Sequence, residues 1–163
     1  MNWLKCNIDG AASGNPGTAA CGGIFRNHDA DFIYGFAEPL GIASSFVAEI
    51  SGVMRAIEIA FHKKWTHLWI ESDSSSVVAA FKNHDKQVAY GLRNRWNNAL
   101  AMVSQMNCVI THIYREGNQV ADLFANFGLS IPDLVFWTEI PLFIKEPFEK
   151  NKLGIPSFRL CSS

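Results

Sequence analysis

The chain has 163 residues, of which 48% are apolar and 18% are charged, and its formal net charge is −1. This length and apolar content suit one domain with a well-packed core, and the balanced charge argues against a highly basic nucleic-acid module, an acidic tail or a disordered chain. The longest apolar runs are far shorter than the ~20 residues that a membrane-spanning helix needs, so no membrane role is expected.

The four cysteines give no sign of a metal site or of a secreted protein. They form no CxxC pair, they have no histidine at zinc-finger spacing, and no secretory leader precedes the first predicted strand. We therefore expect a reduced, intracellular protein, nuclear or cytoplasmic.

The N-terminal part of the chain shows the two-residue period of β-strands. Residues 4–9 alternate apolar and polar side chains, and a cluster of Gly, Ser, Asn and Pro over residues 10–17 ends this strand, so that Asp9 stands at its end. Two further apolar stretches, 19–26 and 32–38, are separated by a polar run. The pattern predicts an antiparallel meander of three strands.

The period then changes to that of a helix over residues 44–64, with Ser44 or Ser45 as a suitable N-cap. Turning each residue by about 100° places Glu49 at the edge of the apolar stripe of this helix, beside small residues. We therefore expect Glu49 neither inside the core nor on the outer face.

A second acidic residue follows a strand farther along the chain. Residues 67–71 are apolar enough for a buried strand, and Asp73 comes just after it. The serines at 74–76 then cap a short helix over 77–82. Asp73 is thus expected just past the carboxyl end of a strand.

The next elements are a helix over residues 92–103 and a strand over 108–114. A tight turn then leads to Asn118, which we expect to cap the last helix of the domain. Asp122 falls about one turn into that helix.

This order of elements predicts an α/β fold in which a five-stranded mixed sheet, with three antiparallel and two parallel strands, is flanked by helices. In open α/β sheets, sites form beyond the carboxyl ends of the strands. We assign residues 1–130 to this domain. Residues 131–163 carry four of the six prolines, with aromatic residues between them, and are expected to form an extended tail packed on the domain.

Each acidic residue, taken alone, also has an ordinary structural explanation. Asp9 begins a common turn sequence, and Glu49 can solvate the flank of a helix. Asp73 can cap a helix, and Asp122 is a favourable charge in a first turn. Only their combination favours a shared function.

Three motifs follow one another along the chain. They are Asp-Gly at 9–10 with Gly-Asn-Pro-Gly at 14–17, then Glu-Ser-Asp-Ser at 71–74, and last Arg-Glu-Gly-Asn-x-x-Ala-Asp-x-x-Ala at 115–125. Their order and setting resemble the type 1 ribonuclease H family over roughly residues 3–129. Within it the chain looks most like the reverse-transcriptase-like ribonuclease H domains of plant retroelements, and the ribonuclease H-like fold is therefore expected.

By this resemblance the catalytic and metal-binding carboxylates are Asp9, Glu49, Asp73 and Asp122. Magnesium prefers hard oxygen ligands, and two ions about 3.5 to 4 Å apart can activate a water and stabilise the leaving oxygen. The implied cofactor is a pair of Mg²⁺ ions, for which Mn²⁺ can substitute.

The resemblance also implies a set of substrate-binding residues, which would contact the 2′-hydroxyls and phosphates of the RNA strand. They are Gly10, Ala11, Asn15, Ser44, Ser45, Ser75 and Arg115.

The chain departs from the family on this substrate side. Residues 44–46 are Ser-Ser-Phe, where bacterial members commonly have asparagines, and no histidine stands between Arg115 and Asp122, where many members have a mobile one. His112 falls within a predicted strand, so Arg115 is the better candidate for a phosphate contact.

The basic region near the helix at 92–103 is also modest. It comprises Lys82, His84, Lys86, Arg93 and Arg95, of which Arg93 and Arg95 are candidates for contacts with the DNA strand. Weak hybrid binding is expected at physiological salt.

The resemblance implies a metal-dependent endoribonuclease that hydrolyses the RNA strand of RNA/DNA hybrids and leaves 5′-phosphate and 3′-hydroxyl ends. Its partner would be nucleic acid, and the chain would be a monomer or part of a larger reverse-transcriptase-type polypeptide. Two alternatives stay open. One is a catalytically weak or inactive module that binds nucleic acid or protein, and the other is a related nuclease that acts on structured DNA.

Overall fold

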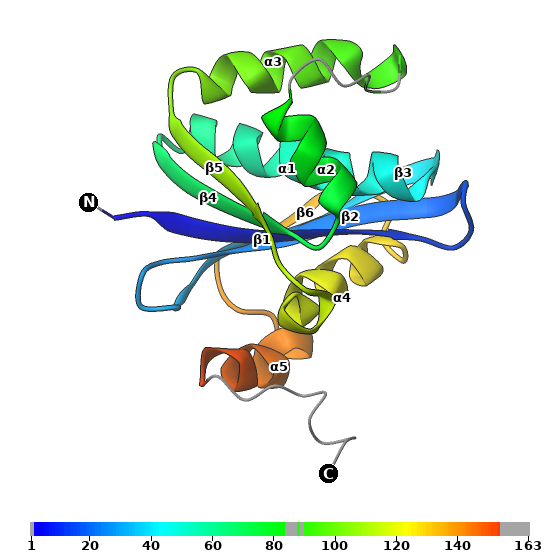
Figure 1. Ribbon diagram of the computed structural model, residues 1–163. Coiled ribbons are helices and arrows are strands. Elements are labelled where there is room, and N and C mark those ends of the chain that lie inside the picture. The colour runs from blue at the N-terminus through cyan, green and yellow to red at the C-terminus, as the bar shows by residue number, and fades with distance from the viewer. Residues whose placement is uncertain (1, 84–87, 89, 154–163) are drawn as a thin grey trace.

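The computed structural model describes residues 2–83, 88 and 90–153, and a six-stranded mixed sheet forms the centre of this part of the chain (Figure 1). The strand order is β5-β4-β1-β2-β3-β6. Strands β1, β4 and β5 are parallel, whereas β2, β3 and β6 join by antiparallel pairing. The strands are β1 (Leu4–Ala12), β2 (Gly17–Arg26), β3 (Phe32–Ala43), β4 (His67–Ser72), β5 (Asn107–His112) and β6 (Val135–Trp137).

Helices cover both faces of the sheet, with α1, α2 and α3 on one face and α4 and α5 on the other (Figure 1). None of the helices in the described residues is long and apolar enough to cross a membrane. The helices are α1 (Ser45–His62), α2 (Ser75–Lys82), α3 (Arg93–Val103), α4 (Gln119–Gly128) and α5 (Leu142–Lys152), with short 3₁₀ turns η1 (Tyr90–Leu92) and η2 (Arg115–Gly117).

The alternation along β1 explains why helices pack on both faces. Cys6 and Ile8 are fully buried in the core that α1, α2 and α3 close. On the other face, Ile24 of β2 is buried against Val120 and Phe124 of α4. Asn7 and Asp9 alternate with Cys6 and Ile8 along β1 and so point to the α4 side, which gives that face of the sheet a polar strip.

The elements expected up to residue 128 are all present, with ends that differ by a few residues. Ser44 is the N-cap of α1, and its hydroxyl accepts a hydrogen bond from the Val47 amide at 3.1 Å. Ser74 caps α2 in the same way through the Val77 amide. Local capping chemistry therefore sets the start of both helices.

The expectation of five strands is wrong, because a sixth strand, β6, pairs with the outer edge of β3. With only three residues, β6 is too short to show the alternation pattern of a strand. The Trp137 ring packs at an angle against the rings of Phe124 and Phe127 of α4, so contacts outside the strand hold β6 in place.

The segment after β6 is helical rather than extended over Leu142–Lys152. Ile144 and Phe148 recur at a spacing of four and are buried against Phe124 and Val120 of α4. The prolines suggested an extended chain, yet Pro141 only precedes the helix as its N-cap residue. Apolar burial against α4 outweighs the cost of Pro147 inside α5.

A cluster of ion pairs joins α1 and α3 to β3. Arg95 makes two hydrogen bonds with Glu58, at 2.8 and 2.9 Å, and Arg55 does the same with Glu38. Arg95 is therefore engaged within the protein, whereas Arg93 is exposed. His84 and Lys86, the other expected basic residues near α3, lie outside the described residues.

Candidate active site

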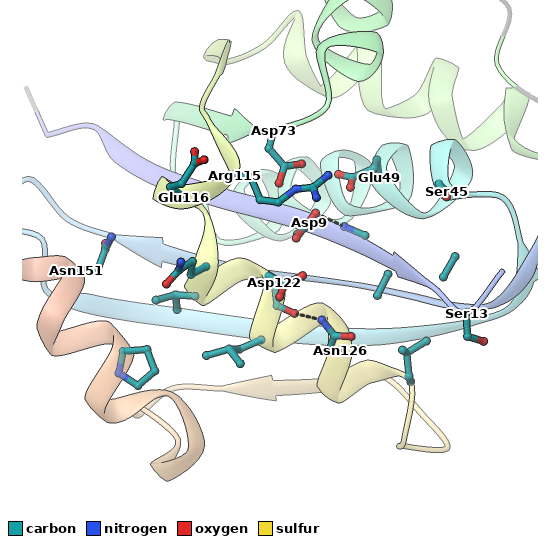
Figure 2. Close-up of a pocket in the computed structure, with 18 of the residues that line it drawn as sticks. Asp9, Ser13, Ser45, Glu49, Asp73, Arg115, Glu116, Asp122, Asn126 and Asn151 are labelled. Atoms are coloured by element: carbon teal, nitrogen blue, oxygen red, sulfur yellow. Dashed lines mark hydrogen bonds between the residues drawn. The ribbon is translucent and has the colours of Figure 1, made fainter. Parts of the chain in front are cut away.

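Three carboxylates from distant parts of the chain meet at one end of the sheet. Asp9 lies on β1, Glu49 on α1, and Asp73 just after β4, and each offers an oxygen that lies within 4.8 Å of the other two. Figure 2 shows the three side chains converging on one opening. Asp73 follows its strand as expected, whereas Asp9 does not end its strand, because pairing with β2 carries β1 on to Ala12.

The pairing of β1 with β4 accounts for two of the three positions. Ile8 is the register partner of Ser72 in this parallel pair, so that Asp9 lies beside Asp73 at the point where β4 ends. Glu49 joins them because α1 approaches the strand closely at Gly10. A Cβ atom at Gly10 would lie 2.6 Å from the Glu49 amide nitrogen, so only glycine permits this approach.

The fourth carboxylate, that of Asp122, comes from α4 on the other face of the sheet. Helix α4 packs directly on β2 at Gly22, where a Cβ atom would lie 2.5 Å from the Ala125 backbone nitrogen. Gly22 is the register partner of Asp9, so this contact brings the first turns of α4 to the Asp9 side chain. Asp122 is exposed and lies outside the tight group of three, but it faces the same opening (Figure 2).

The crowding of negative charge raises the pKa values of the buried members. Burial, a hydrogen bond with Glu49 and the Glu49 and Asp73 charges raise the pKa of Asp9 well above its usual range. Burial also raises the pKa of Glu49, and the Asp73 charge adds to this effect. Asp9 and Glu49 therefore share a proton at neutral pH when no cation is near.

Opposing contacts moderate the effect at Asp73. Burial raises the pKa of Asp73, while a hydrogen bond from Asn118 and the charges of Arg115 and His112 act in the opposite direction. These contacts only partly offset burial, so the pKa of Asp73 is still raised overall.

This donor set fits a hard divalent cation. The group consists of carboxylate oxygens, which Mg²⁺ and Mn²⁺ accept readily, with no sulfur or imidazole among the three residues. Glu49 Oε2 is also buried without a hydrogen-bond partner. A buried carboxylate oxygen without a partner is costly, and a bound cation would satisfy it.

The carboxylates open into a groove of about 1190 Å³ that extends between α4 and α5. Four of the expected substrate-binding residues line it. These are Gly10, Ala11, Ser45 and Arg115. Figure 2 shows the Arg115 side chain reaching across the opening between Asp73 and Glu49.

The other three expected contacts, all among the described residues, do not line this groove. Asn15 accepts a hydrogen bond from the Ser45 amide at 3.0 Å and so joins the β1–β2 turn to the start of α1. The Ser44 hydroxyl is used in capping α1. Ser75 is exposed at the start of α2.

Two features of this site were missed by the sequence interpretation. The α5 residues Glu146 and Lys150, which form an ion pair at 3.1 Å, line the far wall of the groove. Asn118 was expected only as a helix cap, yet its side chain makes no capping hydrogen bond and turns toward β1 and Asp73. The spacing of Ile144 and Phe148 was the available signal for α5, but no local pattern marks the role of Asn118.

Comparisons with known proteins add independent information. A protein-family model described as reverse transcriptase-like matches residues 7–128. The chain is 32% identical over 136 residues to a candidate ribonuclease H protein of Arabidopsis thaliana, an alignment that covers 80% of this chain and 21% of that protein. It is 28% identical over 126 residues to ribonuclease HI of Halobacterium salinarum, which covers 75% of this chain and 62% of the relative. The chain thus spans about a fifth of the first relative and less than two-thirds of the second.

Solved structures show the same likeness. RNase H1 of Halobacterium salinarum superposes with a TM-score of 0.70 at 27% identity, covering 77% of this chain and 96% of that one. The N-terminal RNase H domain of a Mycobacterium tuberculosis protein gives 0.71 at 25% identity, covering 79% and 94%. The LC11 RNase H1, solved in complex with an RNA/DNA hybrid, gives 0.69 at 22% identity, covering 77% and 96%, and bears on the fold alone.

Proposed function

Because the chain belongs to the reverse transcriptase-like family of ribonuclease H domains and has the ribonuclease H-like fold, we propose that it is a metal-dependent endoribonuclease that cleaves the RNA strand of RNA/DNA hybrids. The observation that carries the proposal is the convergence of Asp9, Glu49 and Asp73 within 4.8 Å at the head of an open groove. The mutual repulsion of three crowded carboxylates destabilises the fold, and a bound cation would relieve it, so the cluster supports a metal-dependent reaction.

The residues proposed to hold the metal are Asp9, Glu49, Asp73 and Asp122. When bound, two Mg²⁺ ions, or Mn²⁺ in their place, would supply the charge that activates the attacking water and stabilises the leaving 3′ oxygen. Asp9 and Glu49 must release their shared proton for this binding, and a bound cation would also offset the burial that raises the pKa of Asp73. The products would be 5′-phosphate and 3′-hydroxyl ends.

The expected substrate-binding residues are proposed to act in two ways, by direct contact with the hybrid in the groove or by holding α1 in place. Arg115 lies at the opening, where its guanidinium can meet a phosphate of the RNA strand, and Ser45 and the Gly10 and Ala11 backbone line the groove beside the carboxylates. Asn15 and Ser44 would hold the start of α1, and thereby Glu49, in place. A contact of Ser75 with the hybrid would lie outside the groove.

The larger context is also a proposal. The chain would act as a monomer or as the ribonuclease H part of a larger reverse-transcriptase-type polypeptide, and it would work in the nucleus or cytoplasm. The match to about a fifth of the Arabidopsis relative supports the second arrangement. Within either arrangement, residues 1–130 would carry the carboxylates, and α5 of the predicted C-terminal tail, residues 131–163, would complete the groove wall. The part of that tail after Leu153 lies outside the described residues.

The test is a cleavage assay with an RNA/DNA hybrid, single-stranded RNA, duplex RNA, duplex DNA and branched DNA, each with Mg²⁺, with Mn²⁺ and with chelator. The proposal expects hybrid cleavage that needs metal and is abolished in Asp9→Asn. The matched control is Asp133→Asn, because Asp133 is exposed and lies outside the groove. Full activity of Asp9→Asn would refute the assigned site, and metal-dependent cleavage of branched DNA alone would reassign the substrate.

A failure to cleave any substrate would favour the binding-module alternative. Calorimetric titration with Mn²⁺ separates the two cases, because an intact metal site without cleavage differs from a site that binds no metal. The ion pairs that hold Arg95 are consistent with weak hybrid binding, so the assay is best made at low salt.

A further inference from the structure

Asn118 is buried between β1 and the loop before α4, with only 1% of its surface exposed. Its Nδ2 donates to the Ile8 carbonyl at 2.9 Å, and the same amide lies near the Asp73 carboxyl, whose pKa it lowers. Its Oδ1 accepts a hydrogen bond from Asn7 Nδ2 at 3.1 Å. All the polar capacity of this side chain is thus directed at β1 and Asp73, which explains why it does not cap α4.

Asn7 continues the contact away from the site. It is also 1% exposed, and its Nδ2 donates both to Asn118 and to Glu71 Oε1, each at 3.1 Å. Its Oδ1 accepts from Arg26 Nη2 at 3.1 Å. Asn7 lies two residues before Asp9 on β1, so the same strand carries a proposed metal ligand and this connecting amide.

Arg26 ends the chain of hydrogen bonds. It is 8% exposed, and within the described residues it forms no direct ion pair with a carboxylate. Its Nη1 donates to Asn151 Oδ1 of α5, and its guanidinium lies 5.8 Å from the ring of Phe148 on the same helix. A buried cation is thus compensated mainly by neutral amide oxygens and an aromatic ring, with Glu71 as the nearby negative charge.

The chemistry of the two ends fixes the orientation of both amides. Arg26 can only donate, so Asn7 must turn its oxygen to Arg26 and its nitrogen to Asn118. Asn118 must then accept with its oxygen and donate with its nitrogen, which suits the Ile8 carbonyl and the Asp73 carboxylate. Neither amide can flip without breaking at least two buried hydrogen bonds.

The order Arg26, Asn7, Asn118, Asp73 is therefore a chain of donors that all point toward the carboxylate. Hydrogen bonds arranged in this way polarise one another, and they are stronger in a buried setting than in water. Arg26 does not contact Asp73, so the two aligned amides are the link between them.

We propose that Asn118 is a positioning residue that holds the Asp73 carboxylate toward Asp9 and Glu49, and that Arg26 orients Asn118 through Asn7. The consequence for cleavage rests on the proposed function, whereas the hydrogen-bond chain itself does not. Because Asn151 holds Arg26 from α5, the proposal also couples the C-terminal helix, which lies outside residues 7–128, to the carboxylate site.

The first experiment uses the metal-free protein and needs no activity. The side-chain amide signals of Asn7 and Asn118 are followed by ¹⁵N NMR in the wild type, in Arg26→Met and in Arg26→Lys. The proposal expects slow solvent exchange of both amides and a shift of the Asn118 signals in Arg26→Met, although Arg26 does not touch Asn118. Arg26→Lys keeps a donor and a charge and is expected to restore the wild-type signals. An Asn118 signal that does not respond to Arg26→Met would overturn the relay.

The second experiment measures hybrid cleavage and Mn²⁺ binding. Partners that orient metal ligands typically contribute about 10- to 100-fold in activity or affinity, so Asn118→Ala should lower kcat and Mn²⁺ affinity within that range with little change in KM for the hybrid. Arg26→Met should lower kcat less, and Arg26→Lys should recover it. When Asn118→Ala and Arg26→Met are combined, the loss in kcat should not exceed that of Asn118→Ala alone, because Arg26 acts through Asn118.

The matched control is Asn107→Ala, since Asn107 is exposed on β5 and its side chain bonds only to His67. Thermal unfolding of every variant identifies any that do not fold. If Asn118→Ala does not fold, the comparison of Arg26→Met with Arg26→Lys tests the positioning role. Losses in kcat that multiply in the double variant, or an Asn118→Ala protein with wild-type kcat and Mn²⁺ affinity, would refute the positioning role. If the wild type cleaves nothing, the proposed function fails, while the NMR and Mn²⁺ results still test the relay.

Discussion

The carboxyl groups of Asp9 and Glu49 lie with oxygens within 4.8 Å of each other, although one comes from β1 and the other from α1, and their contact affects the pKa values of both. Two acids can form such a contact only when they share a proton, and burial makes the second ionisation costly. The metal-free site is therefore under electrostatic strain that either protonation or a bound cation relieves.

Neutralising Asp9 should stabilise the metal-free protein. The pKa of Asp9 in the folded protein is raised above that of an ordinary aspartate, so its contribution to stability is full below about pH 4 and is lost as the pH rises toward the folded-state pKa. Asp9→Asn removes this loss and should be more stable than the wild type at pH 8 in chelator, by on the order of 1–3 kcal/mol. The two proteins should converge near pH 4. Thermal unfolding from pH 4 to 8 measures this, and equal melting temperatures at pH 8 would contradict it.

Adding metal should reverse the order of the two proteins. Mg²⁺ or Mn²⁺ binds the folded wild type and should raise its Tm in proportion to the logarithm of metal concentration. Asp9→Asn should respond much less. Because Asp9 and Glu49 must lose their shared proton, metal affinity should rise with pH across the neutral range. Calorimetric titrations at pH 6 and pH 8 would show this, and a pH-independent affinity would argue against these ligands.

Gly10→Ala should separate α1 from β1 at the site. The added Cβ would meet the Glu49 amide nitrogen at 2.6 Å, so the helix must move and carry Glu49 with it. Such overpacking costs about 1–3 kcal/mol, and we expect cleavage and Mn²⁺ affinity to fall together. Gly91→Ala is the control, because a Cβ there meets nothing within 4 Å. Wild-type cleavage by Gly10→Ala would show that the close approach is dispensable.

Arg95→Ala should affect stability rather than hybrid binding. Arg95 forms two hydrogen bonds with Glu58 and lies 3.8 Å from Glu38, so its loss should cost about 1–3 kcal/mol by denaturant unfolding. KM for the hybrid should stay near the wild-type value. Arg93→Ala, at an exposed position on the same helix, is the comparison. A larger rise in KM for Arg95→Ala than for Arg93→Ala would return Arg95 to the substrate side.

Ile144→Ala should show how firmly α5 is packed on the domain. Ile144 is fully buried against α4, and truncation of such a residue costs about 2–5 kcal/mol. Leu142 is 86% exposed at the start of the same helix, so Leu142→Ala should change stability by less than about 0.5 kcal/mol. Chemical denaturation of the two variants gives the answer. Similar small losses in both would mean that α5 contributes little to the fold.

Local sequence patterns were sufficient for the elements that depend on neighbouring residues. The alternation before Asp9, the helical period around Glu49 and the serine caps of α1 and α2 are all short-range signals, and the structure follows them. The resemblance to a family then singled out four acidic residues that were individually ordinary. Three of these form the tight group. Parallel pairing of β1 with β4 places Asp9 beside Asp73, and the close approach of α1 at Gly10 brings Glu49 to them.

Contacts between distant segments decided the rest. Strand β6 has too few residues for a pattern and exists through its pairing with β3, and α5 forms because burial against the apolar face of α4 offsets the cost of Pro147. Asn118 matches the composition of a helix cap, yet buried partners on β1 and at Asp73 outcompete the helix end for its amide. By itself the sequence determined where the acidic residues lie along the chain. Only the tertiary structure decided which groups orient them, because a buried polar side chain takes its role from whichever donors and acceptors the fold brings within reach.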